Sequence, residues 1–372
     1  MKIAHFGVEE WLNTWEEKAT YDISQSSVEA LTLEELVGLD GTTVKDFFGG
    51  LSQKPLDYGW IEGSDSFKEL VSSLYKQVEP ENILQTNGAT GANLLALYAL
   101  IEPGDHVVSM LPTYQQLYDI PRSLGAHVEF VELKEEEQWQ LDLNELKSKL
   151  KPETKMICLN SANNPTGTLL DTPTLKAIVD MAREVDAYIL IDEVYSPLTH
   201  EGDFTSIADL YEKGISTNSL SKTYSVPGLR IGWTASSKEL ADIFRKYRDY
   251  TMICGGVLSD ELAVHALKNK DKILERNRKI VKENLEILNQ WVEKEPRVSL
   301  VSPYYVSTSF IKLDIPQDDQ SFCIDLLEET GVLLAPGSSF DYPGHARLGY
   351  CCRKETLIKG LELLSLYLKK FD

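Results

Sequence analysis

The middle of the chain, residues 82–235, alternates short apolar runs with amphipathic segments. This alternation is typical of βαβ units, in which helices join parallel strands and cover the sheet they form. The predicted strands are 82–86, 106–110, 127–131, 156–160, 188–192, 215–219 and 230–235. The predicted helices between them are 90–101, 113–123, 142–150, 172–185 and 204–212. The sequence therefore predicts an α/β fold with a mainly parallel sheet of seven strands.

The pattern changes after about residue 258. A charged amphipathic segment, 260–292, predicts one long helix, and a strand-like stretch, a helix, two short strands and a closing helix follow it. The total of 372 residues exceeds what one ordinary core accommodates. We expect a large ligand-binding domain over 46–260 and a small α+β domain over 261–372. Residues 1–45 fit neither pattern, and we expect them to pack on the small domain or on a partner subunit.

Charge and composition exclude several classes of function. A net charge of −21 argues against binding to nucleic acid or to an anionic membrane, which attract basic surfaces. The sequence has no apolar run of the length that spans a bilayer, and its acidic N-terminus does not resemble a signal peptide. The 5 cysteines form no C-x-x-C pair. We expect a reduced, cytoplasmic protein without a membrane or nucleic-acid partner.

Ligands of open α/β sheets bind beyond the carboxyl ends of the strands, so the residues there are informative. After strand 82–86 comes "NGATGANLL", in which Gly88 and Gly91 allow a tight turn into a helix. The free amides and the dipole at such a helix start suit a phosphate. An ordinary strand-to-helix turn explains this motif about equally well.

Two more strand ends carry candidate ligand contacts. Tyr114, near a helix start, offers an aromatic ring for stacking on a planar ligand, although a tyrosine wedged between helix and sheet is the commoner outcome. Asn164, in the rigid turn "NNPTG", offers a side-chain amide at a fixed place. A structural Asx-turn is the alternative for Asn164.

The apolar run "YILI" ends in Asp192 and Glu193, with Tyr195 close behind. A carboxylate at the end of a buried strand is unfavourable unless a partner neutralises it. A protonated heterocyclic nitrogen is one such partner, and a structural salt bridge is another. A metal ion is not indicated, because no His or Cys of metal-ligand spacing lies nearby.

The most specific motif is "SLSKTYSVPGLRIGW", residues 219–233. A lysine such as Lys222, desolvated at a strand end, has a lowered pKa and attacks carbonyl carbons. Arg230 and the serines Ser219 and Ser221 suit a phosphate. One ligand requires a phosphate cradle, an aromatic ring, an acid with a phenol and a lysine together, and that ligand is pyridoxal 5′-phosphate (PLP).

At these residues the sequence resembles the class I/II aminotransferases of the fold-type I PLP-dependent enzymes. The motifs "YGWIEG", "NGATGA", "NNPTG", "DEVY", the lysine motif above and "LLAPGSSF…ARLGY" occur in the order and spacing of that family. The resemblance covers essentially the whole chain and implies the fold-type I architecture, with a large PLP-binding domain and a smaller α+β domain.

The resemblance implies roles around the cofactor ring. Lys222 is similar to the lysine that forms a Schiff base with the PLP aldehyde, and Asp192 to the acid that pairs with the pyridine nitrogen. Tyr195 and Asn164 would bond the phenolic oxygen of the ring. Tyr114 would stack on the ring.

The resemblance also implies how the phosphate and the substrate are held. The phosphate would rest on the amides of Ala89 and Thr90 and on the side chains of Ser219 and Arg230. Tyr58 would reach the phosphate of the other subunit, which implies a homodimer with shared sites. Arg347 would bind the substrate α-carboxylate together with Asn164.

The implied activity is a ping-pong transfer of an amino group between an L-amino acid and a 2-oxo acid. A rival on the same cofactor is β-elimination or β-replacement, as in carbon–sulfur lyases or capreomycidine-forming cyclases. A rival without catalysis is the aminotransferase-like domain of a transcription regulator, but this acidic chain has no basic helix-turn-helix segment. An acidic substrate would need a second basic side chain, and the candidates are Arg122, Arg248 and Arg353.

Overall fold

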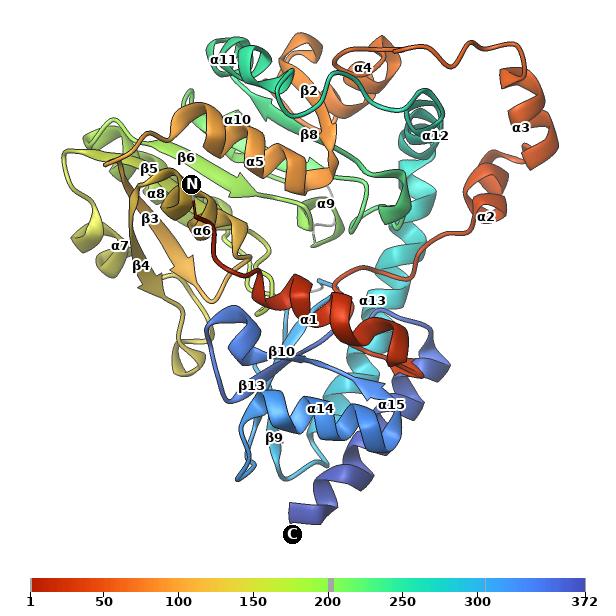
Figure 1. Cartoon of the computed structure of the whole chain (residues 1–372), viewed down its shortest axis with the longest axis vertical. Helices are drawn as coiled ribbons and strands as arrows, with labels where there is room; N and C mark the ends of the chain where they lie inside the picture. Colours follow the sequence, from red (N-terminus) through yellow and green to blue (C-terminus); the bar gives the residue numbers. More distant parts are fainter. Residues whose placement is uncertain (1, 200–203, 305, 372) are drawn as a thin grey trace.

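The computed structural model describes residues 2–199, 204–304 and 306–371. Figure 1 shows a larger unit around one sheet and a smaller unit below it, with the long helix α13 (Lys270–Val292) running between them. The N-terminal helix α1 (Gly7–Trp15) lies where the two units meet.

The larger sheet contains all the strands that the middle of the sequence predicts, in the order β2-β8-β7-β6-β5-β3-β4. The strands are β2 (Ile83–Asn87), β3 (His106–Leu111), β4 (His127–Glu132), β5 (Thr154–Asn160), β6 (Tyr188–Asp192), β7 (Gly214–Ser219) and β8 (Ile231–Ser236). Strand β8 is antiparallel to β2 and β7, and the other pairings are parallel. The predicted α/β class with a mainly parallel sheet is confirmed.

Helices pack on both faces of this sheet (Figure 1), so its central strands have no solvent-exposed face. In β3, for example, the neighbours Val107 and Val108 point to opposite faces, and both are buried. The helices are α4 (Asp65–Ser72), α5 (Gly88–Leu100), α6 (Gln116–Leu124), α7 (Leu143–Lys149), α8 (Thr172–Glu184), α9 (Ser196–Thr199), α10 (Ile207–Leu210) and α11 (Lys238–Arg248). The predicted helix over 204–212 is thus shortened to α10.

The single helix predicted over 260–292 is wrong, because the chain forms two helices there. Helix α12 (Val257–Lys268) ends before Asn269, and α13 begins after it. The Asn269 amide donates to the carbonyls of His265 and Ala266, and its side chain donates to the His265 carbonyl at 3.0 Å. The helix stops here because the backbone of Asn269 leaves the helical conformation, at φ −105° and ψ 17°, and its side chain caps a carbonyl of the last turn.

The smaller unit is built on a four-stranded antiparallel sheet of order β12-β13-β10-β9. Its elements are β9 (Val298–Ser299), β10 (Ser309–Leu313), α14 (Asp319–Thr330), β11 (Val332–Leu333), β12 (Ala335–Pro336), β13 (His345–Leu348) and α15 (Lys354–Leu368). Three short strands therefore follow α14, where the sequence predicted two.

The N-terminal segment packs on the smaller unit. The Trp11 indole of α1 donates to the Leu334 carbonyl at 2.9 Å. Strand β1 (Tyr21–Asp22) pairs in parallel with β11. The following helices, α2 (Leu33–Val37) and α3 (Val44–Leu51), lead into the larger unit, where α2 contacts α12. Among the described residues, no helix is both long and apolar enough to cross a membrane.

The N-terminal segment passes very close to the smaller unit at Gly349. A Cβ atom added there would overlap the Gln25 carbonyl oxygen. We therefore expect Gly349→Ala to destabilise the protein by about 1–3 kcal/mol, the usual range for an overpacked contact. Gly38→Ala is the matched control, because nothing lies within 4 Å of its added Cβ. Thermal unfolding of the two variants tests the contact, and equal melting temperatures would contradict it.

Candidate active site

The carboxyl ends of the parallel strands bring the predicted site residues to one edge of the sheet. In the register of the sheet, Asn160 lies beside Asp192, and Ser219 lies beside Gly232. A cavity of about 500 Å³ opens at this edge. The predicted residues that line it are Ala89, Thr90, Tyr114, Asn164, Asp192, Tyr195, Ser219, Lys222, Arg230 and Arg347.

One end of the cavity is formed by the start of α5. Asn87 gives this helix no side-chain cap, so the first amides remain available, and Ala89 and Thr90 face the cavity. Gly88 has φ +68°, and a Cβ atom there would lie 2.5 Å from Nη2 of Arg230. A Cβ atom on Gly232 would overlap the backbone of Gly88. This end of the cavity is therefore a cradle formed by closely packed backbone that requires glycine at positions 88 and 232. The free amides of this backbone suit an anion such as a phosphate.

Arg230 is brought to the cradle by the turn before β8. It follows the short helix Pro227–Leu229 with φ +53°. Its Nη1 atom donates to the Pro227 carbonyl at 3.0 Å, and the side chain is exposed to the cavity and solvent. Ser219 is buried at the end of β7 and lines the same end.

Asp192 is almost fully buried at the end of β6. Its carboxylate accepts from the Asn93 side chain at 2.8 Å and from the Val194 amide at 3.2 Å. Asn93 is oriented by Thr217, whose hydroxyl donates to it at 2.6 Å. Burial raises the pKa of Asp192, and the Asn93 hydrogen bond opposes the rise. A protonated ring nitrogen would stabilise the ionised form of this carboxylate.

Lys222 is partly buried in the middle of the cavity. Its Nζ atom donates to the Ser26 hydroxyl at 2.7 Å. Burial, with help from the charge of Arg347, lowers the pKa of Lys222 to about 8, although the carboxylate of Glu9 opposes the change. Near physiological pH, the amine of Lys222 is therefore neutral and nucleophilic in a larger fraction of the molecules than an ordinary lysine would be. Burial raises the pKa of the neighbouring Tyr195 phenol to about 12, so this phenol remains protonated.

Arg347, in β13, forms the other end of the cavity and is buried. Its Nε and Nη2 atoms donate to the Ser24 carbonyl at 3.0 and 2.8 Å, and Nη1 donates to the Asn164 side chain at 3.3 Å. The backbone N–H of Asn164 in turn donates to the side-chain oxygen of Asn160 at 2.7 Å. A fixed guanidinium beside an amide suits a carboxylate.

Helix α1 closes the side of the cavity that faces away from the sheet. Tyr114 donates from its hydroxyl to Oε1 of Glu9 at 2.9 Å, and its ring lies 5.1 Å from that of Phe6. Burial raises the pKa of the Tyr114 phenol well above its usual value. Glu9 and Ser26 were missed by the sequence analysis because residues 1–45 matched no pattern. Asn93 carried a signal, as the polar residue within the apolar run "ANLLALYAL".

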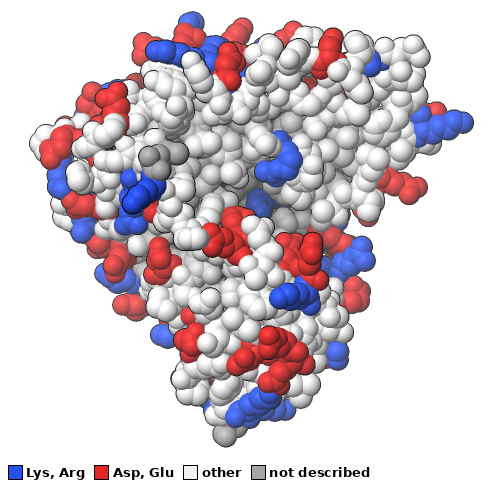
Figure 2. All heavy atoms as spheres, in the orientation of Figure 1, with Lys and Arg blue, Asp and Glu red and all other residues white. Residues whose placement is uncertain are grey.

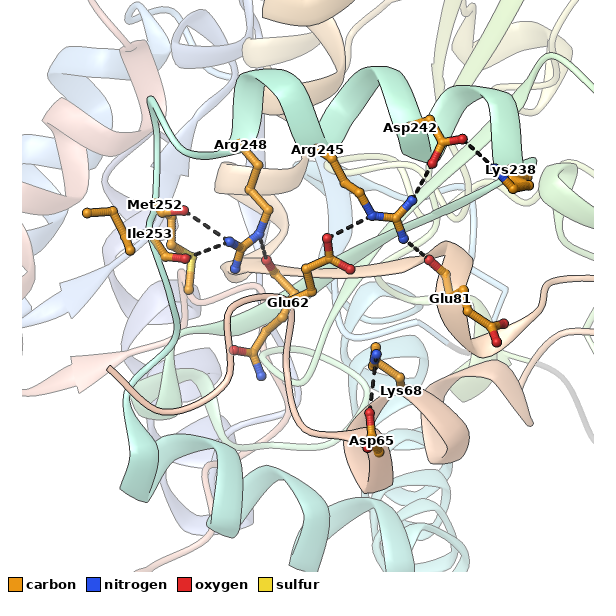
Figure 3. Close-up of polar contacts among 11 residues, drawn as sticks. Glu62, Asp65, Lys68, Glu81, Lys238, Asp242, Arg245, Arg248, Met252 and Ile253 are labelled. Atoms are coloured by element: carbon orange, nitrogen blue, oxygen red, sulfur yellow. Dashed lines mark hydrogen bonds and ion pairs between the residues drawn. The ribbon is translucent and has the colours of Figure 1, made fainter. Parts of the chain in front are cut away.

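The other predicted residues lie outside the cavity. Tyr58 does not line it, and its side chain is 69% exposed. Arg122 pairs with Asp119 at 3.3 Å, and Arg353 pairs with Glu29 at 2.8 Å. Arg248 is buried elsewhere and donates to three backbone carbonyls, two of which Figure 3 labels as Met252 and Ile253.

The described residues contain no group of three or more His, Cys, Asp or Glu side chains that could hold a metal ion. The five cysteines are free thiols. The cradle, the buried acid, the partly neutral lysine and the fixed arginine match the donor groups that PLP and an amino acid require.

A site of this composition at the carboxyl edge of such a sheet defines the fold-type I class of PLP-dependent enzymes. The chain belongs to the aminotransferase class I and II family, which matches residues 45–364. This finding confirms the resemblance seen in the sequence, and it places the chain among the PLP-dependent aminotransferases.

Three similar proteins illustrate the relationship. The crystal structure of a PLP-dependent aminotransferase from Streptococcus suis is 57% identical, has a TM-score of 0.97, and is matched over 100% of this chain and 99% of that one. Aspartate aminotransferase of Thermotoga maritima is 32% identical over 318 residues, 83% of this chain and 82% of that protein. Capreomycidine synthase of Streptomyces vinaceus is 27% identical over 362 residues, 96% of this chain and 92% of that protein.

The lowered pKa of Lys222 predicts the pH dependence of cofactor attachment. With a pKa of about 8, the neutral fraction of the amine rises about tenfold from pH 7 to pH 9 and then levels off. An unperturbed lysine, of pKa about 10.4, would rise about a hundredfold over the same range and continue beyond it. The rate of borohydride-fixed attachment of PLP to the apoprotein, measured between pH 6.5 and 10, distinguishes the two. A rate still rising tenfold per pH unit above pH 9 would contradict the lowered pKa.

Proposed function

We propose that this chain binds PLP in the cavity and transfers an amino group between an L-amino acid and a 2-oxo acid in two successive half-reactions. The observation that carries the proposal is that Lys222 lines one cavity together with the buried acid Asp192 and the buried cation Arg347, and that burial lowers the pKa of its amine to about 8. A cytoplasmic location belongs to the proposal and is supported by the free thiols.

The cofactor's two charged ends have separate partners. When bound, PLP supplies an aldehyde carbon that takes up amino groups and a ring that accepts the electron pair released at the substrate Cα. Asp192, held by Asn93, would keep the ring nitrogen protonated. The α5 amides, Ser219 and Arg230 would hold the phosphate, while Asn164 and the protonated Tyr195 would donate to the phenolic oxygen.

The substrate would bind between Arg347 and Lys222. The Ser24 carbonyl fixes the Arg347 guanidinium, so a bound α-carboxylate has a defined position. Lys222, once free of the cofactor, would take the proton from Cα in one half-reaction and return it in the other. Ser26 holds the Lys222 amine in place through its hydroxyl.

The number of cations in the cavity supports a ping-pong order. The Lys and Arg side chains among the described lining residues are Lys222, Arg230 and Arg347. Since Lys222 serves the aldehyde and Arg230 the phosphate, Arg347 remains for one α-carboxylate at a time. The amino acid and the oxo acid would therefore occupy the same place in turn.

The homodimer also belongs to the proposal and is supported by exposed apolar side chains near Tyr58. The most exposed of these are Leu56, Trp60, Ile61, Tyr250 and Ile253. Two arginines of α11 hold the segments that carry them. Figure 3 shows Arg245 bonded to Glu62, next to Ile61, and Arg248 bonded to the carbonyl oxygens of Met252 and Ile253. An apolar surface of this kind suits a second copy of the chain, which would then receive Tyr58.

Replacement of Lys222 tests the assignment of the central lysine. We expect Lys222→Ala to lose the borohydride-fixed cofactor and at least a hundredfold in kcat, the usual contribution of a general base. Lys238→Ala is the control, because Lys238 is an exposed residue paired with Asp242 at 2.6 Å. Peptide mapping of the fixed cofactor identifies its position. A wild-type amount of fixed cofactor in Lys222→Ala would refute the assignment.

Dependence on an oxo acid tests transamination against elimination. We expect sustained turnover only with both an amino acid and a 2-oxo acid, because the first half-reaction leaves the cofactor aminated. The measurement is product formation with each substrate alone and with both. Pyruvate and ammonia released from cystathionine without an oxo acid would instead identify a carbon–sulfur lyase.

A further inference from the structure

Helix α1 and the turn that follows it contribute one wall of the cavity. Its lining residues, Glu9, Leu12, Asn13 and Glu16, occupy positions i, i+3, i+4 and i+7 and so lie on one face of the helical segment. The opposite face is fixed to the smaller unit, where Val8 and Trp11 are buried. The backbone of this wall is therefore held against the smaller unit.

Two carboxylates of this wall, Glu9 and Glu16, are not among the proposed direct contacts of the cofactor. Glu9 accepts the Tyr114 hydroxyl with Oε1, and no described residue donates to its Oε2 atom or forms an ion pair with it. Glu16 is exposed at the mouth and accepts from the Gln25 side chain at 2.8 Å. Figure 2 shows acidic side chains where Figure 1 places α1, beside a hollow with Lys and Arg atoms. These acids form a negative surface around the part of the cavity left for the substrate side chain.

No cation on the described part of this wall could bind a second carboxylate. The three cations of the cavity serve the aldehyde, the phosphate and the α-carboxylate. The candidates for a further one, Arg122, Arg248 and Arg353, are engaged outside the cavity. The side chain of a dicarboxylic amino acid would instead meet Glu9, a charge of its own sign.

We propose that the amino donor carries a cationic side chain, an ammonium or a guanidinium group, which Glu9 binds inside the cavity and Glu16 attracts at its mouth. This inference rests on the proposed function and names the substrate class of the same site. Phe6 and Leu12, which line the wall beside the two acids, suit the methylene stem of such a side chain. Glu9 also raises the pKa of Lys222, so its charge acts at the reacting centre.

The region shared with the family supports a role in specificity for this wall. The family match begins at residue 45, so it includes the predicted cofactor contacts and excludes α1. The proposed cofactor contacts thus lie inside the matched region, whereas α1 lies before it.

Three acids of similar length that lack an α-amino group test the inference without turnover. They are 6-aminohexanoate, hexanoate and adipate, which carry a cation, a methyl group and a carboxylate at the far end. The protein is loaded with pyridoxamine 5′-phosphate, which has no aldehyde to react with a primary amine. We expect calorimetry on this form to show 6-aminohexanoate binding about tenfold to a hundredfold more tightly than hexanoate, the effect of one charge-assisted hydrogen bond. We expect adipate to bind more weakly than hexanoate. Adipate binding as tightly as 6-aminohexanoate would overturn the inference.

Matched variants of α1 assign the effect. Glu9→Gln keeps the acceptor for Tyr114 but removes the charge, and we expect it to lower the preference for 6-aminohexanoate about tenfold. Glu10→Gln is the control, because Glu10 lies on the same helix, is exposed, and pairs with His5 at 2.7 Å. An unchanged preference in Glu9→Gln would overturn the assignment of this residue.

A panel of amino acids separates this inference from the proposed function. Lysine, norleucine and 2-aminoadipate are mixed with the loaded protein, and conversion of the bound aldehyde to the amine is followed by absorbance. Fastest conversion by lysine supports the inference. Fastest conversion by 2-aminoadipate overturns it and leaves the proposed function intact, whereas conversion by no amino acid in a wider screen overturns the proposed function.

Discussion

The site depends on holding charged groups away from water at one edge of a sheet. Asp192 and Arg347 are both almost fully buried, and an isolated buried charge costs several kcal/mol. Each is therefore held by hydrogen bonds from another part of the chain, Asp192 by Asn93 of α5 and Arg347 by the Ser24 carbonyl of the N-terminal segment. The cavity keeps its charges in place because the larger unit, the smaller unit and the N-terminus meet around it.

The same burial lowers the pKa of the central lysine. Desolvation disfavours the charged amine of Lys222, and the positive charge of Arg347 disfavours it further. A neutral amine is what attack on an aldehyde and proton removal at Cα both need. Arg347, which we expect to bind the substrate carboxylate, therefore also helps to keep the amine of Lys222 neutral.

The N-terminal segment takes part in the cavity although it lies outside the region that matches the family. The proposed cofactor contacts of this chain lie between residues 45 and 364, the region common to the family. Helix α1 and Ser26 lie before it, yet they form one wall of the cavity and hold the lysine amine. We therefore expect the short helix α1 to influence which substrate side chains the site accepts, while the proposed cofactor contacts come from the matched region.

The sequence by itself determined the strands of the large sheet, its α/β class and the set of residues at the strand ends. It could do so because hydrophobic periodicity and tight turns are local, and because parallel strands present their carboxyl ends at one edge. It failed at Asn269, where the backbone leaves the helical conformation inside a continuous amphipathic pattern. Only the tertiary structure placed Ser24, Ser26 and Glu9 at the site, because their contacts with Arg347, Lys222 and Tyr114 join residues more than 100 positions apart. Such contacts arise from packing between units, and no local pattern encodes them.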